Sequence, residues 1–203
     1  WCPDAELAAI DYMRQKGEIN YKKLEFRGID PLNDMWKYIW EDIDAYYKGK
    51  VKFFERDILE LVDIIVEKKW IPDLIIFQYV FSDMCKKKTA GEINIFIDKL
   101  AKFLNEQTGK SIYILANDAN IGMKYEGGRD FFDALEKKIC EPKIMRRYHF
   151  DNDYRTTHYD YGQEYEDNCI YFEIPEYIKE KYDTIDSCAS AQVLIKKIAK
   201  KEG

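Results

Sequence analysis

Long apolar runs, paired cysteines and histidines are all scarce in this 203-residue sequence. No uninterrupted apolar run approaches the roughly 20 residues that a membrane-spanning helix needs, so we expect no membrane association. The 5 cysteines are odd in number, widely spaced and without a CxxC pair, which argues against a disulfide framework and against a zinc knot. This cysteine usage, and an opening segment unlike a signal peptide, predict a cytoplasmic protein.

The 2 histidines, His149 and His158, lie in or near a stretch rich in Tyr, Asp and Asn. A single strand-borne histidine among scattered carboxylates lacks the dependable spacing of metal ligands. We therefore predict no metal site.

The charge of the chain is weighted toward the acidic side, with a formal net charge of -6. This balance argues against unselective attraction to nucleic-acid backbones, although it leaves room for a local basic patch. With 46% hydrophobic and 34% charged residues the composition is globular, and nothing in it marks an interior linker. We predict a single domain over residues 1–203.

Amphipathic helical segments alternate with short apolar runs rich in β-branched and aromatic residues, which is the pattern of βαβ units. The clearest helix follows Pro31 and stops at Gly49, and its apolar residues are spaced three and four apart. These residues are Leu32, Met35, Trp36, Ile39, Ile43 and Tyr46. Strands are predicted at residues 24–29, 51–54, 74–81, 112–115, 144–150 and 191–198. The nearly continuous apolar run at 74–81 indicates a strand covered on both faces, as in parallel sheets.

Residues 151–188 interrupt this alternation. Their first part, 151–168, is dense in Tyr, Asp and Asn and almost lacks aliphatic residues. We predict a loop-rich insertion before the last strand.

Three short segments place acidic or aromatic residues at the ends of predicted strands: Arg-Gly-Ile-Asp at 27–30, Phe-Glu-Arg-Asp-Ile at 54–58, and the run from 73 to 83. In this order they resemble the ends of strands two, three and four of the class I S-adenosylmethionine-dependent methyltransferase fold, entered just after its first strand. The last two predicted strands are similar to the antiparallel pair that finishes the sheet in that family. The resemblance implies an α/β fold with a three-layer, Rossmann-like sheet, mostly parallel with an antiparallel C-terminal strand pair.

The glycine-rich loop that ends strand one in the family is missing, and residues 1–10 look like the segment that follows this loop. Strand one is normally in the middle of the sheet, so its loss would leave neighbouring strands with unpaired backbone groups. We expect an upstream segment or a second chain to complete the sheet.

The resemblance also implies how S-adenosylmethionine would be held. Asp30 would accept hydrogen bonds from the ribose hydroxyls, a task that suits a carboxylate. Asp57 would bond the adenine amino group, and Ile58 would pack on the ring. Each acid has an alternative role, because Asp is also a preferred cap for a following helix.

Gln78 and Tyr79 lie at the carboxyl edge of the expected sheet, where open α/β folds hold their ligands, and we expect both to contact the cofactor. Tyr79 or Phe81 would stack on cofactor or substrate, or else pack in the core. Asp83 lies just beyond and is the candidate base for methyl transfer, which needs an in-line approach and sometimes removal of a proton. The alternative for Asp83 is a solvated loop or a helix N-cap.

The segment Asn117-Asp118-Ala119-Asn120 follows the expected strand at 112–115. It offers hydrogen-bonding groups for a substrate pocket, but Asn and Asp are also ordinary turn formers. We interpret it as a turn.

These features together predict S-adenosylmethionine-dependent methyl transfer to an acceptor that the sequence does not identify. One alternative is a non-catalytic interaction or regulatory module on the same scaffold. Another is an NAD-dependent oxidoreductase, since an acidic tip on strand two also suits the ribose of NAD. The antiparallel end strands, and the lack of a Tyr-x-x-x-Lys-like catalytic pair placed after strand four or five, disfavour the oxidoreductase.

Overall fold

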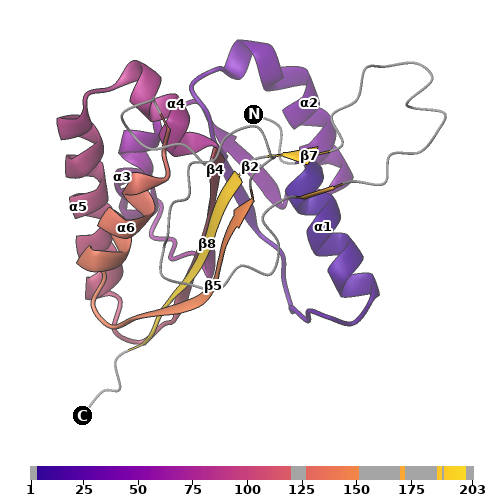
Figure 1. Cartoon of the computed structure of the whole chain (residues 1–203). Helices are drawn as coiled ribbons and strands as arrows, with labels where there is room; N and C mark the ends of the chain where they lie inside the picture. Colours follow the sequence, from indigo (N-terminus) through magenta and orange to yellow (C-terminus); the bar gives the residue numbers. More distant parts are fainter. Residues whose placement is uncertain (1–3, 120–126, 151–169, 172–186, 189, 200–203) are drawn as a thin grey trace. The chain divides into compact units, whose positions relative to one another are not determined.

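The computed structural model describes residues 4–119, 127–150, 170–171, 187–188 and 190–199, and within them the chain is a mixed α/β protein (Figure 1). It divides into two compact units, Trp1–Lys69 and Trp70–Gly203. The prediction of one domain over the whole chain stays a prediction. No helix in the described ranges is both long and apolar enough to cross a bilayer.

The first unit contains two parallel strands and the helices that follow them. Its elements are α1 (Asp4–Gln15), β1 (Phe26–Ile29), α2 (Asn33–Tyr46), β2 (Val51–Phe54), the 3-10 helix η1 (Ile58–Glu60) and α3 (Leu61–Glu67). β1 and β2 pair in parallel, with Phe26 beside Val51 and Ile29 beside Phe54. The carboxyl ends of both strands therefore lie at the same edge.

Helix α2 buries a narrower face than its sequence pattern predicts. Trp40 is buried and stacks on Phe53 of β2, with ring centroids 4.5 Å apart. Four of the six residues of the predicted apolar face are instead exposed: Leu32, Met35, Ile39 and Tyr46. The spacing of the apolar residues therefore predicted the wrong inward face, because the stacked Trp40 turns a different side of the helix toward β2.

Helices α1 and α2 end in the same hydrogen-bonded turn, with different residues at its left-handed position. In α1 this residue is Gly17 (φ 74°), whose N–H donates to the Arg14 carbonyl. In α2 it is Lys48 (φ 55°), whose N–H donates to the Ala45 carbonyl, while Gly49 donates to Asp44. Glycine normally occupies this position because a side chain there is strained, so Lys48 is an exception.

The second unit is built on a four-stranded sheet. Its elements are β3 (Leu74–Gln78), α4 (Val80–Lys87), α5 (Ala90–Glu106), β4 (Ile112–Ala119), α6 (Asp130–Lys138), β5 (Pro142–Phe150), β6 (Ile170–Tyr171), β7 (Ser187–Cys188) and β8 (Ser190–Lys197). The sheet order is β3-β4-β8-β5, and β6 and β7 form a separate antiparallel pair.

Strand directions in this sheet are mixed. β3 and β4 are parallel, whereas β8 runs antiparallel to both β4 and β5. The antiparallel pairing predicted for the last two strands, 144–150 and 191–198, is confirmed. The predicted insertion at 151–188 lies mostly outside the described residues.

Helix α5 supplies a large share of the core of the second unit. It starts with a capping box in which the Thr89 hydroxyl accepts the Glu92 N–H and the Glu92 carboxylate accepts the Thr89 N–H. Its buried face is Ile93, Phe96, Ile97, Leu100, Ala101, Phe103 and Leu104. Helices α5 and α6 pack together on one side of the sheet (Figure 1).

Two predicted strand boundaries were wrong. The strand expected at 74–81 ends at Gln78, because Tyr79 adopts a left-handed conformation and Val80 opens helix α4. The strand expected at 112–115 continues to Ala119, so Asn117 and Asp118 are strand residues. Both corrections fall at the carboxyl edge of the β3–β4 pair.

Candidate functional site

A single-residue turn joins β3 to α4 at this edge. Tyr79 has φ 54° and ψ 26°, and its N–H donates to the Asn117 carbonyl of β4 at 2.8 Å. The Ser82 hydroxyl donates to the Tyr79 carbonyl at 3.2 Å. A non-glycine residue costs about 1–2 kcal/mol in this conformation, and the hydrogen bonds on both sides of Tyr79 hold it there.

Asp118 lies under the start of α4 and is fully buried. Its Oδ2 accepts the N–H groups of Phe81 (3.0 Å) and Ser82 (3.1 Å), and its Oδ1 accepts the N–H of Ala119 (2.8 Å). The amino end of a helix attracts a negative group, and here a carboxylate of the chain itself occupies that position. The start of α4 is therefore capped from within and is not a site for an external anion.

Burial raises the pKa of Asp118 above its ordinary value, since desolvation disfavours the charged form. The hydrogen bonds from Ser82, Ala119 and Phe81 act in the opposite direction but are the smaller effect. Asp118 is thus a structural carboxylate held at some electrostatic cost.

Gly128 packs directly on this cap. A Cβ atom added to Gly128 would lie 2.7 Å from both Asp118 Oδ2 and the Ser82 nitrogen, and closer still to the Cβ of Phe81. Only glycine fits here without moving the start of α4. The loop before α6 is thereby tied to the β3–α4 turn.

An amide pair stands beside the turn. Gln78 and Asn117 are register partners on β3 and β4, and the Asn117 side chain donates to Gln78 Oε1 at 3.1 Å. Both side chains are half-buried, and Asn117 Oδ1 is buried without a hydrogen-bond partner among the described residues. With Tyr79, which is 42% exposed, they form the polar surface of this edge.

In the first unit, Asp30 and Asp57 follow the carboxyl ends of the paired strands β1 and β2. The Asp30 N–H donates to the Phe54 carbonyl at 3.1 Å, which extends the strand pairing to the tip of β1. Asp30 Oδ1 accepts the Leu32 N–H at 2.7 Å in the turn that leads into α2. The alternative role predicted for Asp30, capping of the following segment, is present.

Asp57 is also a cap. It forms a capping box in which Oδ1 accepts the Leu59 N–H at 3.0 Å and the Glu60 carboxylate accepts the Asp57 N–H at 3.3 Å. Ile58, the first residue of η1, is half-buried. The two acid tips and Ile58 thus share one edge of one parallel strand pair.

The other predicted residues differ in their surroundings. Phe81 is completely buried and packs between Phe77 and Phe131, so it is a core residue rather than a stacking platform. Asp83 lies in the first turn of α4, not in a loop, with an exposed side chain 4.0 Å from the Lys86 ammonium. Its role as a base stays a prediction.

Sequence reasoning missed Asp118, although a signal for it exists. Burial alternates residue by residue along Ile112–Ala119, and Asp118 shares the buried face with Ile112, Ile114 and Ala116. Continuing the alternation of Ile112 and Ile114 to residues 116 and 118 would have predicted that the Asp118 carboxylate is buried. Turn propensity outweighed periodicity in the prediction.

Within the described ranges, no group of three or more His, Cys, Asp or Glu residues is arranged to hold a metal ion. The side chains of His149 and His158 lie outside what the structure describes. Comparison with protein-family models and with curated protein sequences finds no match for this chain.

Proposed function

We propose that this chain is a methyltransferase of the class I, Rossmann-like type, which transfers a methyl group from S-adenosylmethionine to an acceptor not yet identified. One observation carries the proposal: the sheet of the second unit continues from the parallel pair β3–β4 into antiparallel β8 and then β5. The class I sheet finishes with an antiparallel strand pair, which simpler doubly wound sheets lack.

The proposed three-layer sheet needs one more strand. Among the described residues, β1 pairs only with β2, and β3 pairs only with β4. Each pair therefore has a strand edge to which another strand can bind through backbone hydrogen bonds. In the proposed fold an upstream segment, or a second chain, supplies the central strand together with the glycine-rich loop.

The residues at the β1–β2 edge fit the nucleoside half of S-adenosylmethionine. The ribose diol and the adenine amino group are hydrogen-bond donors, and Asp30 and Asp57 are carboxylates that can accept them. A carboxylate has about four lone-pair sites on two oxygens, so accepting one backbone N–H does not exhaust either side chain. Ile58 adds an apolar surface beside them.

The resemblance also assigns cofactor contacts to Gln78 and Tyr79 at the β3–β4 edge, where the hydrogen-bonded Tyr79 turn would fix their positions. When bound, S-adenosylmethionine supplies a methyl group on a positively charged sulfur. The work of the chain is then mainly to orient donor and acceptor for in-line attack. Asp83 is the proposed acceptor of a proton where the methyl acceptor must lose one.

The test measures binding of S-adenosylhomocysteine to the native protein, including whatever precedes Trp1, by calorimetry and by thermal shift. A bound ligand stabilises the folded protein by about 2.7 kcal/mol when its free concentration is 100 times its Kd, and this raises the unfolding temperature. Asp30→Asn keeps an acceptor for the Leu32 N–H but removes the second acceptor that a diol requires. We expect Asp30→Asn to weaken binding at least about tenfold, a loss of roughly 1.4 kcal/mol, with the unliganded stability little changed.

Asp63→Asn is the matched control, because Asp63 is an exposed acid of α3 in the same unit, and this variant should bind as the wild type does. Absence of any shift with S-adenosylhomocysteine in the native protein would contradict the proposal. It would favour the alternative of a non-catalytic module. In such a module, helix and turn capping alone would explain the presence of Asp30 and Asp57.

A further inference from the structure

A basic groove lies in the first unit, where the ends of α1 and α2 meet the residues that lead into β1 and β2. It has a volume of about 310 Å³. Its lining residues are Asp11, Arg14, Tyr21, Lys22, Lys23, Leu24, Tyr46, Tyr47, Lys48 and Lys50. Five of these ten are cations and one is an acid, although the whole chain carries a net charge of -6. The groove is thus a local reversal of the protein's charge.

Most of this positive charge is not neutralised by neighbouring acids. Lys23 pairs with Glu25, but Lys22, Lys48 and Lys50 form no ion pair with any residue in the described part of the chain. A groove with three such ammonium groups attracts a polyanion.

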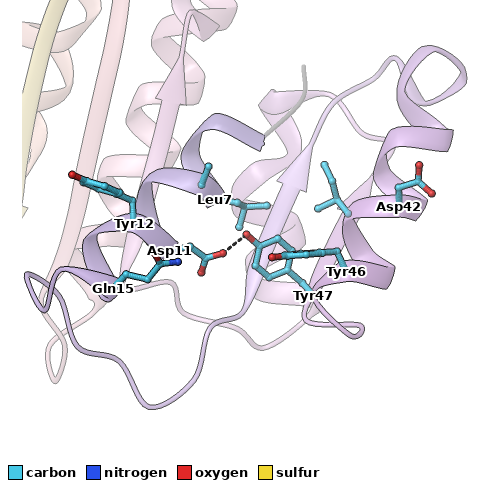
Figure 2. A pocket seen from close by; sticks show the side chains of 9 residues that line it. Leu7, Asp11, Tyr12, Gln15, Asp42, Tyr46 and Tyr47 are labelled. Carbon is cyan, nitrogen blue, oxygen red and sulfur yellow. Dashed lines mark hydrogen bonds between the residues drawn. The ribbon is translucent and has the colours of Figure 1, made fainter.

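The single acid of the groove, Asp11, is hydrogen-bonded within the chain. Asp11 Oδ2 accepts the hydroxyl of Tyr47 at 2.7 Å (Figure 2). Burial, and then this hydrogen bond, raise the pKa of Tyr47, so its phenol stays protonated and adds no second negative charge. The Asp11–Tyr47 pair forms a fixed wall between the basic groove and its neighbour.

A second groove shares this wall, and its nine lining residues include three tyrosines and two acids, Asp11 and Asp42. It lies between α1 and α2, has a volume of about 640 Å³ and also includes Tyr12 and Tyr46 (Figure 2). Tyr12 is 58% exposed and Tyr46 is 76% exposed. Two tyrosine rings lie beside cations. The Arg14 guanidinium is 4.7 Å from the ring centre of Tyr21, and the Lys16 ammonium is 5.4 Å from the ring centre of Tyr12.

This combination favours one kind of partner. A membrane surface would call for large exposed aliphatic side chains beside the cations, whereas the large exposed apolar side chains that line the two grooves are tyrosines. An acidic peptide would use the cations but has no need of exposed ring faces. Single-stranded nucleic acid uses both, with phosphates on the cations and bases stacked on the rings.

We propose that these two adjoining grooves bind single-stranded nucleic acid, with Lys22, Lys48 and Lys50 holding phosphates and Tyr46 stacking on a base. The binding surface is at the amino ends of β1 and β2, opposite the acid tips Asp30 and Asp57. It therefore stands independently of the proposed methyl transfer.

Binding of a labelled oligouridylate, about 12 nucleotides long, to the full chain is measured by fluorescence anisotropy over a range of salt concentrations. The affinity should fall as salt rises, and Lys48→Gly should reduce the slope of log K against log salt by about 0.7, the loss of one phosphate contact. Lys48 occupies a left-handed position that glycine prefers, so this variant should not lower the unfolding temperature. Weaker binding then cannot be attributed to misfolding.

Lys69→Gly is the matched control for Lys48→Gly. Lys69 is also left-handed (φ 50°), follows α3 in the same unit, and lines neither groove. The two variants make the same change of net charge, and only Lys48→Gly should weaken binding.

The stacking half of the proposal has its own pair of variants. Tyr46→Ala should weaken binding at least about fivefold. Tyr38→Ala should leave it unchanged, because Tyr38 is equally exposed (78%) on the same helix but lines neither groove.

Three results would overturn the inference. The first is no binding at low salt. The second is an equal effect of Lys48→Gly and Lys69→Gly, which would indicate unspecific attraction. The third is competition by polyglutamate, or binding to anionic vesicles, with no sensitivity to Tyr46→Ala, which would assign the groove to an acidic protein or a membrane.

Discussion

Asp118 accepts three backbone N–H groups, from Phe81, Ser82 and Ala119, with a side chain that has no exposed surface. Two of these donors begin a helix and the third belongs to a strand, so one side chain connects α4 with β4. The same burial that makes the hydrogen bonds strong also raises the pKa of the carboxyl.

Substituting Asp118 should separate the effect of its hydrogen bonds from the effect of its buried charge. Asp118→Ala leaves the buried Phe81 and Ser82 N–H groups without their acceptor, and we expect a loss of about 3 kcal/mol of unfolding free energy. Asp118→Asn should lose less, because its carbonyl oxygen can still face α4. Denaturant unfolding at neutral pH measures both.

The raised pKa also fixes the direction of a pH effect. Between its ordinary value of 3.8 and the higher folded value, Asp118 binds more protons in the folded than in the unfolded state. Its contribution to stability is then fully present at or below about pH 4 and declines as pH rises through the folded pKa. The stability advantage of the wild type over Asp118→Asn should therefore be largest near pH 4 and shrink toward pH 7. An advantage that grew with pH would mean that the pKa is lowered.

At the scale of elements, the junction of β3, α4 and the loop before α6 depends on close approach. Gly128 lies against Asp118 and the start of α4 with no room for a side chain. The left-handed Tyr79 turns the chain from strand into helix within one residue. Together they leave this edge little room for a substitution.

Gly128→Ala should accordingly destabilise the protein by about 3 kcal/mol, at the upper end of the usual range for overpacking. Gly109→Ala is its control, because an added Cβ there meets nothing within 4 Å, and it should change stability by no more than about 0.5 kcal/mol. Thermal or chemical unfolding of the two variants checks the pair. Equal effects would show that the close contact at Gly128 is relieved by a small shift.

How well each element follows from its sequence depends on which physical signal dominates. Helix α5 combines a strong period with a capping box, and its apolar residues spaced three and four apart are all buried: Ile93, Phe96, Ile97, Leu100 and Leu104. The end of β3 could not be placed, because Val80 and Phe81 are as apolar as the strand before them and Tyr79 is not a residue type that signals positive φ.

The residues of the candidate site also divide into those that the sequence predicts and those that it does not. The acid tips Asp30 and Asp57 were predictable, since each ends a short apolar run, and so was their capping role. The basic groove was not, because its cations come from 14, 22–23 and 48–50, which are brought together only by the ends of two helices. Net charge alone pointed away from it.

At the scale of the whole molecule, the two units differ in how their strands are paired. β4 is hydrogen-bonded on both sides, by β3 and β8, whereas β1 and β2 each have one strand partner among the described residues. The second unit also holds the longer buried helix, α5. Stability should therefore be unequal along the chain.

Hydrogen exchange measures this difference directly. Amides at the centre of β4, such as those of Ile114 and Ala116, should exchange at least about tenfold more slowly than those of Gly28 and Phe53. If a further strand pairs with β1 in the native protein, exchange at Arg27 and Ile29, whose N–H groups alternate with those that donate to β2, should slow when that strand is present. Equal protection in both units of the chain alone would contradict the expectation.

Asp30 and Asp57 each hold a backbone turn, and nucleoside binding as proposed would place a second selective pressure on the same two carboxylates. A descendant that gave up catalysis would still need an oxygen at both positions to start its helices. Asparagine preserves that oxygen almost as well, and it removes the negative charge that the proposed nucleoside contacts would use. Asparagines at both positions would then indicate a homologue that keeps the fold but no longer binds the nucleoside.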